Sequence, residues 1–185
     1  VLPRLPAAAP GWLVRNLKSV GGAYAWVEPP ADRTPITRDR LPVTANLAFR
    51  AAAAGALRFD PALGAVGNVP RRGEETAFVE GLLKAGHRGL WLTDTAVDHY
   101  IEASRASLKW LRDLYFEGGR TFAQSGQFVE SGGVPRWAWR RLVTLWLIRS
   151  ALAPIKNETW TAAFREFHNL RGAIAAVRAR GESAG

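Results

Sequence analysis

The sequence predicts an α/β domain followed by a helical tail. Between residues 41 and 99, short apolar segments typical of buried strands alternate with helix-like patterns, as in α/β domains. From residue 107 onwards, long helical periodicity replaces this alternation. A chain of 185 residues suffices for one ordinary domain and little more, so one domain with a tail is expected.

The N-terminal part is expected to hold one short helix and one strand. Residues 10–20 place apolar side chains at roughly helical spacing, with Pro10 near the first turn and Gly21-Gly22 as a stop. Residues 23–27 have the composition of a strand. Two prolines and a charged run without periodicity follow, so residues 28–41 are expected to form a loop.

A second strand and a glycine-rich loop precede the next helix. Residues 41–50 are apolar and short enough for a buried strand, and the alanine-rich run after them predicts a brief helix ending near Gly55. Residues 59–64 indicate a turn. Glycines, a proline and two arginines fill residues 64–73, which we expect to form a loop that leads into a helix at Glu74.

This helix is expected to end at Gly86 and to be followed by two extended segments. Residues 87–93 have the character of a buried strand, and residues 95–99 are expected to be extended. Glu74 and Glu75 occupy the first turn of the helix. Negative charge there complements the helix dipole and caps free amides, so a purely structural role is one explanation of the pair.

Three helices are predicted in the remainder of the chain. Residues 107–122 are amphipathic, and Gly118-Gly119 is expected to end or bend this helix. The second helix covers residues 134–152 and the third residues 158–178, with Pro154 between them. The apolar stripe of the third is typical of packing against a neighbour. Arginines crowd the start of the second, which leaves fewer than the roughly 20 apolar residues that a membrane span needs.

Composition excludes thiol chemistry and points to a polyanionic partner. The chain has no cysteine and therefore neither disulfides nor thiolate ligands. Its net charge is +9, and ten lysines and arginines against four glutamates place six of these charges between residue 120 and the end. Tryptophans lie among them, which favours an anionic membrane surface. A platform for single-stranded nucleic acid and a merely solvated basic face are the alternatives.

Other common chemistries find no support. The sequence has no P-loop pattern, no glycine fingerprint of dinucleotide folds and no zincin spacing of its three histidines. The chain starts on Val1, contains no methionine and opens without a signal-like segment. We therefore expect it to be a piece of a longer protein.

Several short motifs follow one another in the first 125 residues. They are Thr44-Ala-Asn-Leu-Ala-Phe-Arg50, Phe59-Asp-Pro-Ala-Leu-Gly64, Gly73-Glu-Glu-Thr-Ala-Phe78 with Leu82-Leu-Lys-Ala-Gly86, Ala96-Val-Asp-His99, and Arg105-Ala-Ser-Leu-Lys-Trp110 with Tyr115-Phe-Glu-Gly118. Their joint order resembles the second half of the catalytic domain in family 2 glycosyltransferases, and the tail resembles the family's C-terminal helices. The resemblance implies that residues 1–125 form the C-terminal, acceptor-side half of an A-type, Rossmann-like α/β domain and that residues 126–185 form a helical tail.

The first strands and the Asp-x-Asp element of that family have no counterpart here. In the family these parts hold the nucleotide-sugar and its divalent metal. The resemblance therefore implies that the donor-binding half lies outside this chain and that the chain alone is inactive.

The resemblance implies transfer of a sugar, with inversion, from a nucleotide-diphosphate donor to a polysaccharide, lipid-linked or other cell-envelope acceptor. Such a reaction needs a carboxylate that deprotonates the acceptor hydroxyl as it attacks the anomeric carbon. Glu75 aligns with this base, where family members commonly have Asp. Glu74 aligns with the preceding acidic position and is expected to position the acceptor or the loop by hydrogen bonding.

Five further residues match family positions. His99 matches a histidine near the diphosphate and the metal, which implies Mg²⁺ or Mn²⁺ as cofactor, while a hydrogen-bonded structural role is the alternative. Arg105 is expected to offset charge on the departing diphosphate, or else to form an ordinary surface ion pair. Asn46 resembles a position that lines the sugar pocket. Trp110 and Tyr115 offer flat surfaces to an acceptor or lipid, and the same pair equally fits a core.

Charge pattern and resemblance together imply a cytoplasmic protein that lies peripherally on the inner face of the cell membrane and does not use nucleic acid as a partner. The competing hypothesis is a non-catalytic, basic helical adaptor that binds an anionic membrane or nucleic acid. An adaptor explains the basic tail but not the Gly-Glu-Glu-Thr block followed by His99 and Arg105.

Overall fold

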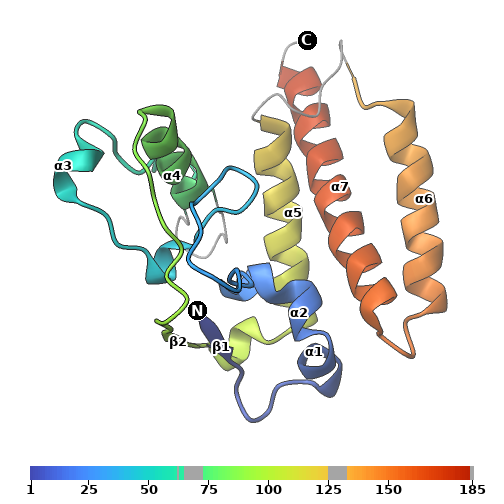
Figure 1. Ribbon diagram of the computed structural model, residues 1–185. Coiled ribbons are helices and arrows are strands. Elements are labelled where there is room, and N and C mark those ends of the chain that lie inside the picture. The colour runs from blue at the N-terminus through green and yellow to red at the C-terminus, as the bar shows by residue number, and fades with distance from the viewer. Residues whose placement is uncertain (62, 65–72, 125–132, 184–185) are drawn as a thin grey trace.

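The computed structural model describes residues 1–61, 63–64, 73–124 and 133–183, and this part is mostly helical (Figure 1). Three long helices stand at the C-terminal end, and short elements gather around the N-terminus. In chain order the strands and α-helices are β1 (Leu2–Arg4), α1 (Gly11–Arg15), α2 (Leu17–Val20), α3 (Ala51–Ala54), α4 (Glu74–Lys84), β2 (Asp98–Tyr100), α5 (Leu108–Gln124), α6 (Arg136–Ala151) and α7 (Glu158–Ser183).

The predicted α/β fold class is wrong. Within the described residues, the sheet consists of β1 and β2 alone, which pair in parallel with Pro3 opposite His99. A Rossmann-like sheet has several parallel strands with helices on both faces. The described residues therefore do not form half of an A-type glycosyltransferase domain, and helix packing organises the chain instead.

Three segments predicted as strands adopt other conformations, namely residues 23–27, 41–50 and 87–93. The first lies at the end of a 3₁₀ helix, where Ala25 takes a left-handed backbone with φ of 58°. The second contains a short 3₁₀ turn, and the third forms one isolated bridge through Leu90. A short apolar run does not by itself define a strand, because a strand also needs neighbours to pair with.

Helices predicted from periodicity are confirmed, with one expected break that does not occur. α1 and α2 cover the first predicted helix, and α4 begins at Glu74 and is followed by Gly86 with φ of +84°. Residues 28–41 form a loop with isolated bridges, as expected. α5, however, continues through Gly118-Gly119 to Gln124. These glycines therefore do not end the helix.

Close approach of α5 to α7 explains the glycines. A Cβ atom on Gly119 would overlap the backbone carbonyl of Asn169, and one on Gly172 would overlap the carbonyl of Phe116. The two helix backbones are thus in direct contact, which leaves no space for a side chain at either position. The predicted tail consequently packs on α5 and shares its core.

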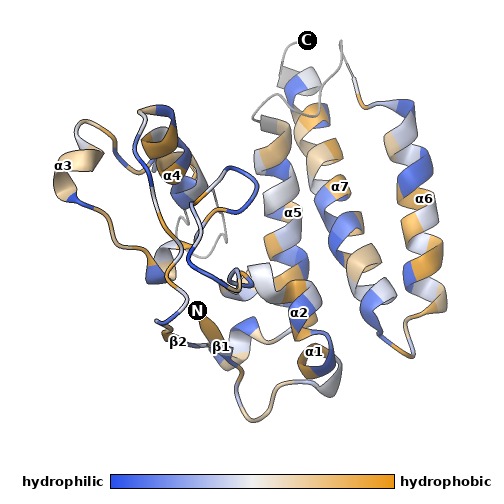
Figure 2. Ribbon diagram, viewed as in Figure 1, coloured by the Kyte–Doolittle hydropathy of each residue, from blue (hydrophilic) through white to orange (hydrophobic). Residues whose placement is uncertain are grey.

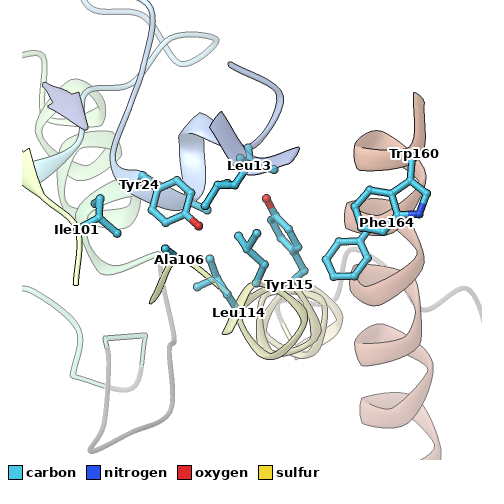
Figure 3. Close-up of a cluster of buried hydrophobic side chains, with 11 residues drawn as sticks. Leu13, Tyr24, Ile101, Ala106, Leu114, Tyr115, Trp160 and Phe164 are labelled. Carbon is cyan, nitrogen blue, oxygen red and sulfur yellow. The ribbon is translucent and has the colours of Figure 1, made fainter. Parts of the chain in front are cut away.

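The larger core joins α1, α2 and the following 3₁₀ helix to α5 and the start of α7 (Figure 3). Figure 3 shows Tyr24 and Tyr115 between the N-terminal segment and α5, with Trp160 and Phe164 projecting from α7. The rings of Trp160 and Phe164 stack at 5.0 Å. The buried residues of this larger core are Leu13, Val20, Ala23, Tyr24, Ile101, Ala106, Leu111, Leu114, Tyr115, Trp160 and Phe164.

A second core lies between α5, α6 and α7. Alanine is its commonest buried residue, which lets the helices approach closely. α6 contributes Ala138 and Leu145 as its buried residues and lies beside α7 on the side away from α5 (Figure 1). Hydrophobic and hydrophilic residues both occur along α6 (Figure 2). Much of this helix therefore faces solvent.

A buried amide connects the two ends of the chain. Asn16 is 3% exposed, and its Nδ2 donates hydrogen bonds of 2.7 Å to the carbonyl oxygens of Trp12 and Lys156. Lys156 lies in the turn between α6 and α7 and has a left-handed backbone with φ of 47°. The Asn16 side chain thus fixes that turn against α1.

Candidate functional site

α4 carries the two predicted acidic residues in its first turn. Gly73 precedes them with φ of +128°, a conformation that favours glycine, and it directs the chain into the helix. Glu74 and Glu75 are both half-buried. Burial raises the pKa of Glu74 above its usual value, and the neighbouring Glu75 raises it further. Glu74 therefore holds a proton to higher pH than an exposed carboxylate.

The carboxylate of Glu74 is also incompletely bonded. Its Oε2 atom is buried and has no hydrogen-bond partner among the described residues. A buried carboxylate oxygen without a hydrogen-bond partner lowers the stability of the folded protein. Packing alone therefore does not explain why Glu74 occupies this position. Glu74 thus combines a raised pKa with a buried oxygen that lacks a partner among the described residues, and acid and base chemistry uses both properties.

An apolar cavity lies beside the second half of α4. Its volume is about 340 Å³, and Arg50, His87 and Arg88 are its basic lining residues. Neither Glu74 nor Glu75 lines it. Its apolar walls come from three segments and include Ile36, Leu47, Phe49, Val79, Leu82, Leu83 and Leu90.

A second group of predicted residues gathers around Tyr24. The ring of Trp110 stacks on that of Tyr24 at 5.6 Å, and the guanidinium of Arg105 lies 4.8 Å from the centre of the Trp110 ring. The Tyr24 hydroxyl donates a 3.1 Å hydrogen bond to the carbonyl of Arg105. Because burial raises the pKa of Tyr24, this hydroxyl stays a neutral donor.

His99 joins the same group through its ring. Its Nδ1 lies 3.0 Å from the carbonyl oxygen of Tyr24. A carbonyl only accepts, so Nδ1 carries the proton and Nε2 is the nitrogen left to act as base or ligand. The parallel pairing of β1 with β2 holds His99 in this position.

Tyr115 and Asn46 differ from the surfaces expected of them. Tyr115 is only 3% exposed and packs edge-on against Phe164 at 6.4 Å, so it belongs to the core. Asn46 lies exposed in the 3₁₀ turn Thr44–Asn46 and not at the end of a strand. Of the two explanations offered for Tyr115, the structure therefore supports packing.

The acidic pair and the group around Tyr24 lie in separate parts of the molecule. Figure 1 shows α4 well apart from β2 and from the start of α5. His99, Arg105 and Trp110 are brought together, whereas Glu74 and Glu75 are not placed beside them. The described residues thus present two partial sites.

The described residues do not make a divalent metal site by themselves. No three histidine, cysteine, aspartate or glutamate side chains among them lie close enough to hold a metal ion. His99 offers one nitrogen, whereas Mg²⁺ and Mn²⁺ prefer several oxygen ligands. Further ligands would have to come from elsewhere.

His168 is a buried titratable residue that the sequence reasoning did not single out. It is 3% exposed, and neither ring nitrogen has a hydrogen-bond partner within the described part of the chain. Burial, together with the nearby Arg149 and Arg171, lowers its pKa to about 4. Its position inside the apolar stripe of α7 was the available signal. Tyr24 was likewise missed as the centre of its group.

No helix in the described ranges combines the length and the apolar character needed to cross a bilayer. Comparison with family models, curated proteins and solved structures finds no match to this chain. Any function must therefore be argued from the residues themselves.

Proposed function

We propose that this chain is the acceptor-side part of a glycosyltransferase that works in the cytoplasm, peripherally on the inner face of the cell membrane. It would transfer a sugar from a nucleotide-diphosphate donor to a saccharide or lipid-linked acceptor of the cell envelope. The acidic pair Glu74–Glu75 carries this proposal, because both residues are half-buried, burial raises the pKa of Glu74, and the Oε2 atom of Glu74 has no hydrogen-bond partner among the described residues. The proposal concerns chemistry and does not rest on the fold class.

Glu75 is the proposed base. As the acceptor oxygen forms its bond to the anomeric carbon, the proton of that hydroxyl passes to a carboxylate oxygen of Glu75. The bond between the anomeric carbon and the diphosphate oxygen breaks, and the nucleoside diphosphate leaves with its electron pair. Attack from the opposite side inverts the anomeric carbon. Glu74 assists by hydrogen bonding, since its raised pKa favours a protonated donor.

The group around Tyr24 lies apart from Glu75 (Figure 1), so Arg105 does not reach a diphosphate that leaves as Glu75 takes the acceptor proton, and no role in the transfer step is assigned to this group. The guanidinium of Arg105 instead stacks on the ring of Trp110. Asn46 remains a proposed contact to the sugar. The sequence has no Asp-x-Asp element, which holds the divalent metal in the family that the motifs resemble, so no step is assigned to Mg²⁺ or Mn²⁺.

Substitution of the proposed base tests the assignment. Release of nucleoside diphosphate from a panel of nucleotide-sugars is measured with the natural protein that includes a donor-binding part. Glu75→Gln should lower kcat by about 10²–10⁴-fold at unchanged donor affinity, because a general base contributes that much. Glu75→Asp should retain substantial activity, because Asp is common at this position in the family that the motifs resemble.

Glu80→Gln is the matched control, since Glu80 lies on the same helix and pairs with Lys84. It should leave kcat unchanged. A Glu75→Gln variant as active as the unsubstituted protein, or one that has lost donor binding, would contradict the role of Glu75.

A non-catalytic helical adaptor is the second candidate. The observation that favours it is the mostly helical structure with exposed arginines on α6. It predicts no turnover of any nucleotide-sugar by any form of the protein, together with binding to anionic vesicles or nucleic acid. Turnover separates the two candidates.

A further inference from the structure

α6 buries one side against α7 and leaves the other uncovered. Ala138 and Leu145, which point inward, are its buried residues. Seven residues separate them, so they lie on the same side of the helix after two turns. The residues on the opposite side are exposed in the described structure.

Large apolar side chains occupy this uncovered side. Val143 is 59% exposed, Leu147 54%, Trp146 51% and Trp139 38%. Val143 and Leu147 are one turn apart on the side opposite Ala138 and Leu145. Trp139 and Trp146 are two turns apart on the adjoining flank, so the four residues form one continuous exposed surface. We call these four residues the outer face of α6. A contiguous exposed patch of large apolar side chains indicates an interaction surface.

Cations border the outer face. Arg136 and Arg140 are exposed beside Val143 and Leu147 on the helix surface, and the guanidinium of Arg178 lies 4.8 Å from the centre of the Trp139 ring. α6 contains four arginines and no acidic residue. A partner for this surface must therefore combine an apolar layer with negative charge.

Two residues of the basic, tryptophan-rich C-terminal part make contacts within the protein and do not belong to this surface. Arg141 points toward α7, where it forms two hydrogen bonds of 2.7 and 2.6 Å with Glu166. Trp160 is buried in the larger core. Arg136 and Arg140 remain as exposed cations of α6 next to its outer face.

We propose that the outer face of α6 binds the surface of an anionic phospholipid bilayer, with the helix lying in the plane of the interface. Trp139 and Trp146 would sit at the level of the headgroups, Val143 and Leu147 would enter the acyl region, and the arginines would contact lipid phosphates. Two aliphatic residues in the stripe favour lipid over nucleic acid, because bases stack on aromatic rings and not on aliphatic chains. The inference rests on the membrane location in the proposed function and names the surface responsible for it. It requires no sugar transfer, so loss of vesicle binding and loss of turnover are separate outcomes.

Vesicle sedimentation tests the inference with the full chain. The probes are vesicles of equal parts phosphatidylglycerol and phosphatidylcholine, vesicles of phosphatidylcholine alone, and a single-stranded oligonucleotide. Binding should be strong only to the anionic vesicles, should weaken with added salt, and should shift tryptophan emission to the blue. Arg136→Gln with Arg140→Gln should weaken binding by about 30-fold, since two surface cations are lost.

Arg38→Gln with Arg40→Gln is the charge-matched control, because both residues are exposed in the loop of residues 28–41. It should bind far more tightly than the α6 variant. Val143→Ser with Leu147→Ser should abolish the emission shift while the circular dichroism spectrum stays unchanged.

Three outcomes would overturn the inference. The first is equal loss of binding in both arginine pairs, which would indicate a diffuse charge effect. The second is tighter binding to the oligonucleotide than to the vesicles. The third is self-association that Val143→Ser with Leu147→Ser removes, because the outer face would then cover a second copy of the chain.

Discussion

Two regions of the molecule contrast in how they bury their apolar residues. The helical frame, which comprises residues 1–24 and 101–183, supplies every buried residue of both hydrophobic cores. The central segment, residues 28–100, contains α3 and α4 and, apart from Pro42, Phe78 and Val79, leaves its described apolar residues partly or fully exposed. Contacts between buried side chains hold the helical frame together, whereas few buried contacts hold the central segment in place.

The contrast teaches where stability and chemistry lie in this chain. In the central segment, Phe78 stacks on Phe59 at 4.3 Å and meets Phe49 at 5.0 Å, a small cluster beside the acidic pair. A region with few buried contacts opens more readily than a packed core. The proposed base Glu75 therefore lies in the more adaptable region, and the outer face of α6 lies on the rigid one.

The largest expected effect breaks the frame at the crossing of α5 and α7. Alanine at both Gly119 and Gly172 should lower the free energy of unfolding by about 4 kcal/mol, because the added methyl groups overlap backbone that cannot move aside. Urea denaturation followed by circular dichroism measures the change.

Gly181→Ala is the control for this experiment. Gly181 lies on α7 with open space around its Cα. Alanine there should raise stability by about 0.5 kcal/mol through helix propensity and reduced entropy of the unfolded chain. Equal effects at all three glycines would show that the helices do not approach as closely as described.

A pH titration sharpens the contrast, because His168 lies within the frame. Its folded pKa of about 4 is below the ordinary value, so at neutral pH the histidine is uncharged in both states and contributes no pH dependence. Below about pH 6.5 the unfolded chain takes up a proton that the folded chain refuses. Stability should fall by about 3 kcal/mol between about pH 7 and about pH 4 from this residue alone.

Comparison with His168→Gln isolates the effect. The carboxylates and the other histidines titrate in both proteins, so the difference between their stability curves reports His168. Parallel curves would mean that the folded protein accommodates the charged imidazole.

The smallest expected effect concerns the exposed ion pair between α6 and α7. Arg141 and Glu166 join α6 to α7 by two hydrogen bonds, yet both side chains are 46% exposed. Arg141→Gln should therefore cost only about 0.5 kcal/mol. Arg140→Gln, one residue away and exposed, serves as reference in the same urea titration. A loss beyond about 2 kcal/mol at Arg141 would show that this pair, and not the small buried contact of α6, holds the helix in place.

Sequence reasoning succeeded where a single segment carries the whole signal. The periodicity of α5, α6 and α7 is local, and the glycine at 86 marks the end of α4. The strand predictions for residues 41–50 and 87–93 were wrong, because an apolar segment becomes a strand only where neighbouring segments pair with it. The prediction that Gly118-Gly119 ends the helix was wrong for a related reason. A glycine pair that permits close helix packing has the same local sequence pattern as one that ends a helix.

The candidate site shows the same difference between local patterns, which the sequence reveals, and long-range contacts, which it does not. The position of Glu74 and Glu75 at a helix start follows from the glycine-rich loop and the apolar residues after it. The grouping of His99, Arg105 and Trp110 around Tyr24 depends on contacts between distant segments, namely the pairing of Pro3 with His99 and the stacking of Tyr24 on Trp110, which no local pattern reveals.

The hydrogen bond from Asn16 to Lys156 has a consequence for the order of events during synthesis. On the ribosome, α1 emerges long before the turn between α6 and α7 exists. Until that turn arrives, the Asn16 amide must remain hydrated, so the surface that will surround it stays open to water. The early helices can therefore gather, but they cannot complete their packing until nearly the whole chain has been made.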